Sequence, residues 1–166
     1  RMEYAFVDRV LEAVGGPGYG SVPLTMLDVG TGASVLPDLA APRVPGGIVC
    51  VDPDFAVVRA QRDLAARADA AHVRDYVVAD GERLPFRDRT FPIVTRISVL
   101  EHLPAAKRLA VMRELLRVVR DDGVVVVTVD YRELSAADRC RKLLGRLRKA
   151  VSLIVRGRPG AAVAAA

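Results

Sequence analysis

Five short and almost continuously apolar segments alternate with segments of helical periodicity, and this alternation limits the fold more than any other feature of the chain. The apolar runs cover residues 24–29, 48–51, 73–79, 93–99 and 124–129. Strands that are apolar on both faces are typical of a parallel sheet with helices on each side. Right-handed crossovers between such strands predict an α/β protein with a doubly wound, mainly parallel sheet.

The spacing of apolar residues predicts helices around these strands. A first helix over residues 1–14 is expected, and a glycine-rich connector over residues 15–20 ends it. A short helix is expected over residues 33–39. The helix over residues 55–68 has Val57, Ala60, Leu64 and Ala68 along one face. The helix after Pro104 is expected to bury a stripe formed by Leu109, Met112, Leu115, Leu116 and Val119.

Length and composition favour one globular domain with a sizeable core, since the chain has 166 residues and 51% hydrophobic residues. We expect residues 1–130 to form the α/β core with its N-terminal helix, and residues 131–166 to form a helix and tail of the same domain. No leader peptide and no membrane span are expected, because no apolar run approaches the roughly 20 residues that a span needs. Two isolated cysteines, Cys50 and Cys140, favour reduced thiols and a cytoplasmic location.

The basic character of the chain lies in its last 36 residues. The net charge is +5, but residues 131–166 contain nine Lys or Arg against two acidic residues, so residues 1–130 are slightly acidic. This segment predicts a basic amphipathic helix, with Arg139, Lys142, Arg146 and Lys149 on one face and Leu143, Leu147, Val151 and Ile154 on another. It could cover the sheet edge, contact a membrane surface or a protein partner, or attract an anionic substrate. No aromatic residues are interleaved with the basic ones, so no specific nucleic-acid partner is expected.

The first three strands each end near an aspartate: Asp28, Asp52 and Asp80. The first is followed by Gly30 and Gly32, which allow the backbone to approach a ligand closely. Asp52 follows Gly30 by 22 residues, the distance at which a carboxylate is expected to bind ribose hydroxyls. A dinucleotide fingerprint requires a glycine at the position of Val35, and a pyrophosphate would be repelled by Asp28. The pattern therefore favours a nucleoside ligand that carries a positive charge.

Five motifs in this order resemble those of class I S-adenosylmethionine-dependent methyltransferases, and most closely the branch called methyltransferase type 11. They are LDVGTG (27–32), VD (51–52), ADGERLPF (79–86), VLEHL (99–103) and ELLRV (114–118). The resemblance covers about residues 24–130 and implies the Rossmann-like methyltransferase fold. It implies S-adenosylmethionine as the cofactor, a ligand with a sulfonium cation, a ribose and an adenine.

The resemblance also implies which residues bind the cofactor. They are Asp28, Gly30, Gly32, Asp52, Pro53, Asp80, Gly81 and Arg96. The turn after the first strand would line the methionine end, Asp52 would bind the ribose hydroxyls, and Asp80 would accept a hydrogen bond from the adenine amino group. Residues 96–98 would pass beneath the cofactor.

Three departures from the family pattern stand out. Ser34 occupies the position of a third glycine, and Pro92 replaces the Asp that usually follows Phe91. The segment after Asp130 shows no convincing strand pair, so we expect the fold to lack its usual C-terminal pair of strands. The fifth strand would then have an open edge, and either the basic helix covers that edge or two chains form a homodimer across it.

The implied function is methyl transfer from S-adenosylmethionine to an unidentified small-molecule acceptor by in-line displacement. His102 is the candidate general base, with packing or capping of its loop as the alternative role. No metal is expected: Glu101 and His102 resemble a metal-binding pair, but Ser98 stands where a third ligand is needed. A cofactor-binding but inactive or truncated scaffold is the alternative function. A nucleotide-dependent oxidoreductase ranks third because of Val35 and Asp28.

Overall fold

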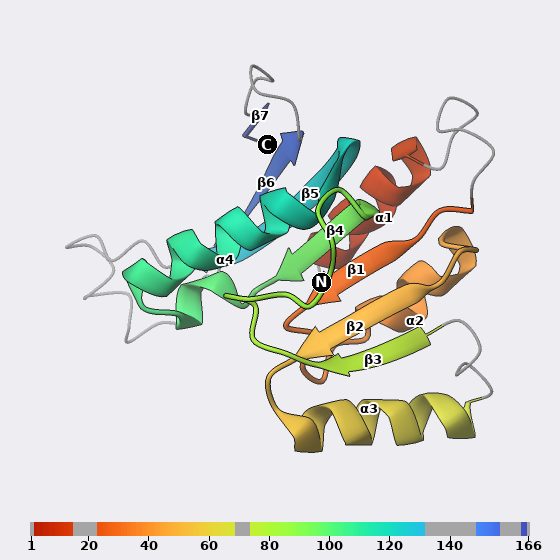
Figure 1. Ribbon diagram of the computed structural model, residues 1–166. Coiled ribbons are helices and arrows are strands. Elements are labelled where there is room, and N and C mark those ends of the chain that lie inside the picture. The colour runs from red at the N-terminus through yellow and green to blue at the C-terminus, as the bar shows by residue number, and fades with distance from the viewer. Residues whose placement is uncertain (1, 15–22, 69–73, 132–148, 157–163, 166) are drawn as a thin grey trace, which may run out of the picture.

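The computed structural model describes residues 2–14, 23–68, 74–131, 149–156 and 164–165, with side chains described for residues 3–14, 23–68 and 74–129 (Figure 1). The strands are β1 (Met26–Val29), β2 (Ile48–Asp52), β3 (Arg74–Val78), β4 (Phe91–Ile97), β5 (Val119–Tyr131), β6 (Lys149–Arg156) and β7 (Ala164–Ala165). The helices are α1 (Met2–Val14), α2 (Leu36–Ala40), α3 (Phe55–Arg67) and α4 (Ala105–Val118), with 3-10 turns η1 (Ala41–Arg43) and η3 (Leu100–His102).

The strands form one sheet in the order β3-β2-β1-β4-β5-β6-β7. The first five strands of that order run parallel, which confirms the doubly wound α/β sheet predicted from the sequence. The strand order reverses between β1 and β4, where Asp28 pairs in register with Thr95. Ligands of such sheets bind beyond the carboxyl ends of the strands at this reversal.

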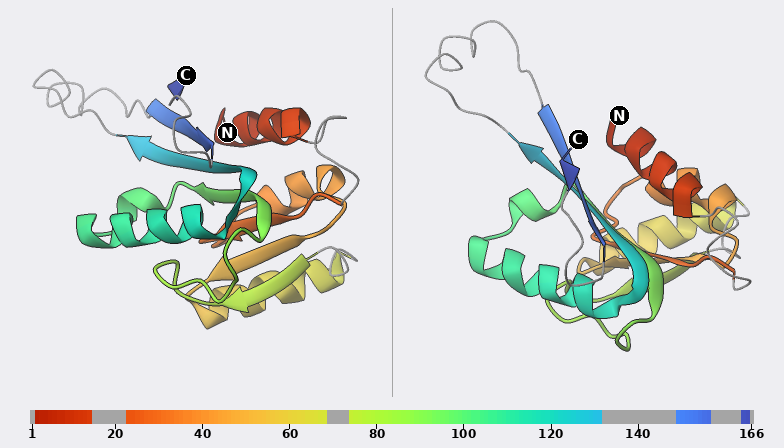
Figure 2. Two further views of the ribbon diagram at one scale, coloured as in Figure 1. Left: turned by 45° about the horizontal axis from the view of Figure 1, so that its top comes forward. Right: turned by 90° about the horizontal axis from the view of Figure 1, so that it is seen from above.

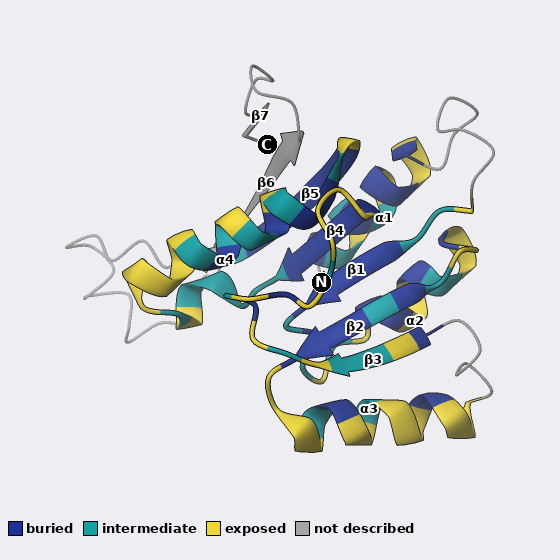
Figure 3. Ribbon diagram, in the orientation of Figure 1, coloured by how far each residue is buried: buried dark blue, intermediate teal, exposed yellow. Residues whose placement is uncertain are grey.

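Helices cover both faces of the sheet (Figure 2): α1 and α2 lie on one side, and α4 lies on the other. Alternate residues of each strand enter two separate apolar clusters, as the pleat requires. Met26 of β1 packs with Val7 and Leu36 from α1 and α2, whereas Leu27 packs with Leu115 of α4. The central strands are accordingly buried along their length, as Figure 3 shows, while α3 packs beside β2 and β3 with much of its surface exposed.

The buried faces of two helices differ from the predicted ones. Helix α3 buries Val58 and Ala65, whereas Leu64 of the predicted face is exposed. Helix α4 buries residues 111, 115 and 118, and its Leu109 and Leu116 are exposed. Apolar residues occupy neighbouring positions on α4, and one residue turns a helix face by about 100°. The sequence pattern therefore fitted two faces, and contact with the sheet selects one.

The expectation that the C-terminal strand pair is missing was wrong. Strand β6 pairs antiparallel with β5 over the register from Tyr131–Lys149 to Val124–Arg156, and β7 pairs antiparallel with β6. The predicted basic helix is therefore wrong for residues 149–156, and residues 132–148 lie outside the described part of the chain. Residues 150–155 read AVSLIV, and β-branched residues fit a pleated strand better than a helix.

The pairing of β6 also removes the open β5 edge on which two further expectations depended. A helix is not needed to cover that edge, and a homodimer across it has no unpaired strand to use. Contacts of the tail with a membrane surface or a partner stay predictions, now without the helical face proposed for Lys149 and its neighbours.

Pro92 is accommodated by an irregularity between β4 and β5. Phe91 pairs with Val119 and Ile93 pairs with Val124, so the register shifts across Pro92. A proline cannot donate to the ladder and is tolerated where the pairing is interrupted. The same shift lets β5 begin at Val119, directly after the last residue of α4.

In the part of the chain that the structure describes, no helix has the length and hydropathy that crossing a membrane requires.

Candidate cofactor site

The turn after β1 depends on two glycines. Gly30 has φ +79° and Gly32 has φ +51°, a left-handed conformation that other residues rarely adopt. The amides of Gly30 and Thr31 both donate to the carbonyl of Val51, at 2.7 and 3.0 Å, and hold the turn against the end of β2. A Cβ on Gly30 would lie 3.1 Å from the Val99 side chain, so space as well as backbone conformation favours glycine here.

Asp28 is buried in the sheet beneath this turn. Its carboxylate accepts hydrogen bonds from the hydroxyls of Thr31 and Thr95, the latter at 2.7 Å. Burial raises the pKa of Asp28, against the opposing effects of the two hydroxyls and of Arg96. Both oxygens thus have partners inside the protein, and the structure gives Asp28 an anchoring position. Its predicted contact with the methionine end of a cofactor stays a prediction.

Asp52 connects the ends of the first two strands. One carboxylate oxygen accepts a hydrogen bond from the Gly32 amide at 2.9 Å, and the other accepts one from the Asp54 amide at 3.0 Å. Gln61 of α3 adds a third link, since its amide nitrogen donates to the Gly32 carbonyl. A carboxylate can accept about four hydrogen bonds, so Asp52 keeps capacity for two hydroxyl donors. Pro53 follows it and is exposed.

The segment after β3 brings Asp80 and Gly81 to the same edge of the sheet. Asp80 is exposed, and its carboxylate accepts a hydrogen bond from the Glu82 amide. Gly81 is buried: a Cβ built on it would lie 3.0 Å from Nη1 of Arg96 and 3.3 Å from the Val29 side chain. Any larger residue at Gly81 would displace the Arg96 guanidinium.

Arg96 lies near the end of β4 and is only 4% exposed. Its Nε has no hydrogen-bond partner among the described residues. Burial lowers the pKa of Arg96, while the nearby carboxylates of Asp28, Asp80, Asp52 and Glu101 act in the opposite direction. The predicted site residues therefore meet at one edge of the sheet, with Arg96 electrostatically coupled to three of its aspartates.

Helix α1 contributes two residues that the sequence did not suggest. Glu3 is buried and accepts a hydrogen bond from the Ser98 hydroxyl at 2.7 Å. The hydroxyls of Tyr4 and Ser34 lie 3.4 Å apart, so the helix reaches the loops after both β1 and β4. The available signal was a carboxylate in register with the buried stripe, since Glu3 precedes Val7 by one helical turn. Ser34 also accepts a hydrogen bond from the Leu36 amide and so supports the start of α2.

His102, the candidate base, is exposed in the turn η3 after β4. The described residues contain no cluster of three or more His, Cys, Asp or Glu side chains that could hold a metal ion. The role of His102 and the expected independence of metal both stay predictions.

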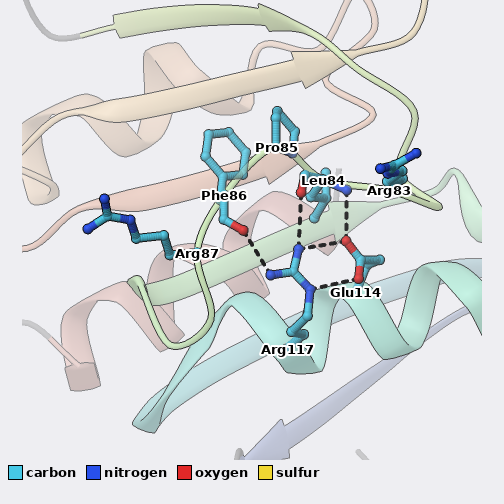
Figure 4. A pocket seen from close by; sticks show the side chains of 7 residues that line it. All are labelled: Arg83, Leu84, Pro85, Phe86, Arg87, Glu114 and Arg117. Carbon is cyan, nitrogen blue, oxygen red and sulfur yellow. Dashed lines mark hydrogen bonds and ion pairs between the residues drawn. The ribbon is translucent and has the colours of Figure 1, made fainter.

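Two of the quoted motifs form one polar network (Figure 4). Arg117 of α4 donates to both oxygens of Glu114 at 2.7 Å and to the carbonyls of Leu84 and Phe86. Glu114 in turn accepts a hydrogen bond from the Leu84 amide, and the neighbouring guanidinium lowers the pKa of Glu114. An open groove lies over this network, lined by residues 83–87 together with Glu114 and Arg117. The network fixes the segment between β3 and β4 on α4.

A doubly wound sheet with strand-end carboxylates and a glycine turn defines a Rossmann-like nucleoside-binding protein. A family model described as a methyltransferase domain matches residues 27–127, and the chain belongs to that family. The match includes every predicted cofactor residue.

Curated relatives agree with this assignment. The chain is 34% identical over 125 residues to a malonyl-(acyl-carrier protein) O-methyltransferase from Geobacter sulfurreducens, covering 72% of this chain and 45% of the relative. It is 32% identical over 116 residues to a ubiquinone/menaquinone biosynthesis C-methyltransferase from Idiomarina loihiensis, covering 68% and 45%. The chain thus spans about half the length of the curated relatives it matches.

Among solved structures, the fold is similar to that of the YcgJ protein from Bacillus subtilis, with a TM-score of 0.67 at 20% identity. That similarity covers 82% of this chain and 53% of the other. At this level of identity the match supports the fold.

Proposed function

We propose that this chain binds S-adenosylmethionine at the carboxyl ends of β1, β2 and β3 and transfers its methyl group to a small-molecule acceptor. Asp52 is the observation that carries the proposal. Its carboxylate is held by two backbone amides at the end of β2 and retains acceptor capacity for the two ribose hydroxyls. Family membership supplies the reaction class, and the acidic strand ends suit a cationic ligand.

The residues present fit such a cofactor. The glycine turn brings backbone close to the strand ends, and the exposed Asp80 carboxylate can accept a hydrogen bond from an adenine amino group. When bound, S-adenosylmethionine supplies a methyl group on a positively charged sulfur, ready for in-line displacement by the acceptor. The protein then has to align the acceptor and exclude water, which can lower the barrier by about 7–11 kcal/mol. His102 serves as general base where the acceptor must lose a proton.

The two curated relatives are named for different acceptors, one for O-methylation and one for C-methylation. We therefore assign the acceptor no finer class than a small molecule. No feature of the described site favours the inactive scaffold over an enzyme. Release of S-adenosylhomocysteine on incubation with candidate acceptors separates the two functions.

Isothermal titration with S-adenosylmethionine tests the cofactor assignment. We expect Asp52→Ala to weaken binding about 5- to 150-fold, the effect of losing hydrogen bonds that a charged acceptor makes, at about 1–3 kcal/mol. Asp63→Asn on α3 is the matched control, because it removes an exposed carboxylate outside the site and should leave the affinity unchanged.

The result for the unmodified protein is read first. If the folded protein does not bind S-adenosylmethionine, the cofactor proposal is wrong. If it binds and Asp52→Ala binds equally well, the ribose assignment of Asp52 is wrong while the cofactor stands.

A further inference from the structure

Arg96 is a buried cation at the proposed cofactor edge, and the described structure does not give it an ordinary ion-pair partner. Its side chain points to the α4 side of the sheet, where Nη1 comes within 3.0 Å of the position that a Cβ of Gly81 would take. The residue is 4% exposed, and its Nε finds no acceptor among the described residues. Burying a charged group without hydrogen bonds is costly, so this position calls for an explanation beyond packing.

The nearest acidic groups use their hydrogen-bonding capacity on other partners. The Asp28 oxygens accept hydrogen bonds from Thr31 and Thr95. The Asp52 oxygens accept hydrogen bonds from backbone amides of Gly32 and Asp54. These carboxylates act on Arg96 through space. The site therefore has a fixed positive charge surrounded by negative ones, in the absence of a direct salt bridge from Arg96 among the described residues.

A positive charge here has opposite consequences for two ligands of almost the same shape. S-adenosylmethionine carries a sulfonium cation, while its product S-adenosylhomocysteine has a neutral thioether in the same place. The carboxylates of Asp28, Asp52 and Asp80 favour the cation, and the Arg96 guanidinium opposes it. An arginine stays charged at neutral pH even when it is buried, so this opposition is permanent.

We propose that Arg96 determines how strongly the site distinguishes the charged cofactor from its neutral product, by repelling the sulfonium while leaving the thioether unaffected. The inference rests on the proposed function, because it requires the cofactor to bind at this edge. It assigns Arg96 the role of a specificity-determining residue that keeps the acidic strand ends from holding the sulfonium too tightly.

Titration of both ligands into charge variants of the full chain tests the proposal. We expect Arg96→Met, which keeps the length of the side chain and removes its charge, to raise the preference for S-adenosylmethionine over S-adenosylhomocysteine about three- to tenfold. This is the size of effect that one unit charge has on another at several ångströms in a partly shielded site. Arg96→Lys keeps the charge and should keep the preference within about twofold of the unmodified protein. Arg113→Met removes an exposed charge from α4 and serves as the control.

The affinity ratio separates electrostatics from structure. If Arg96→Met weakens both ligands equally, Arg96 only supports the loop at Gly81 and the proposal is overturned. A fall in the preference for the cofactor also overturns it. Failure of the unmodified protein to bind either ligand would instead refute the proposed function.

A second neutral variant guards against a folding defect. Arg96→Gln retains amide donors in place of the guanidinium and should show the same rise in preference. Should neither neutral variant fold, the unmodified protein decides the matter: a preference for S-adenosylmethionine above about tenfold contradicts a repulsive role for Arg96.

Discussion

Asp28 shows how a single carboxylate can be retained in a core at a cost in stability. Its pKa is raised by burial, so the folded state binds a proton more readily than the unfolded chain does. The neutral form therefore stabilises the fold below the ordinary pKa of an aspartate. That contribution is lost as the pH rises through the pKa of the folded state.

Asp28→Asn, which removes the titration, is expected to gain stability relative to the unmodified protein as the pH rises from about 3.5 to 7. Urea unfolding of both proteins at a series of pH values measures the difference. Asp121→Asn, which changes an exposed carboxylate, should show no comparable trend. A difference that changes in the opposite direction would mean that the hydroxyls of Thr31 and Thr95 outweigh burial.

Ser98 combines an unfavourable backbone conformation with a buried hydrogen bond. Its φ is +52°, and its hydroxyl donates to the buried Glu3 carboxylate at 2.7 Å. Ser98→Ala should destabilise the protein by about 1–3 kcal/mol, because Glu3 loses its hydroxyl partner. Ser98→Gly loses the same bond but relaxes the backbone, so it should be more stable than Ser98→Ala by about 0.5–1 kcal/mol.

Thermal or denaturant unfolding of the two variants gives this order directly. Equal stability of the alanine and glycine variants would show that the left-handed backbone at Ser98 carries no strain. An unchanged stability in both would contradict the buried hydrogen bond to Glu3.

At the scale of elements, α4 tests which of two sequence patterns the sheet selects. Leu115 is fully buried and Leu116 is 43% exposed, although the two are adjacent and chemically identical. We expect Leu115→Ala to cost about 2–5 kcal/mol of unfolding free energy, as for other buried leucines. Leu116→Ala should cost much less, and unfolding in urea compares them. Similar losses for both would place the buried face of α4 between them.

The sequence predicted which elements exist better than it predicted how they turn. Apolar runs such as residues 124–129 identify strands, because a parallel sheet buries both faces of a strand. The faces of α3 and α4 depend on contacts with the sheet, which adjacent apolar residues such as Leu115 and Leu116 leave open. Strand β6 was interpreted as a helix, since periodicity alone cannot separate a short apolar run in a strand from one in a helix.

At the scale of the whole molecule, β6 determines where the sheet ends. Strand β5 lies between β4 and β6, so its amides on both sides have neighbours. We expect amides of residues 125–127 to exchange with solvent as slowly as those of β1, and hydrogen exchange followed by NMR measures this. Fast exchange at alternate residues of β5 would mean that its outer edge is open in solution.

The candidate site was largely predictable because sequence-distant residues share a topological position. Asp52 and Asp80 follow parallel strands, and the carboxyl ends of such strands meet at one edge of the sheet. The contribution of Glu3 was not predictable, since only the packing of α1 places it against Ser98. Burial of Arg96 without a direct partner depends likewise on the path of the segment around Gly81.

The direct succession of α4 and β5 has a consequence for engineering this chain. Val118 ends the helix and Val119 begins the strand, and both are buried in the same apolar cluster. An inserted tag, a circular permutation point or a single added residue at this junction has no loop to absorb it. It would rotate the helix by about 100° or reverse the facing of every following β5 side chain. Splitting or labelling this protein should therefore avoid the α4–β5 junction.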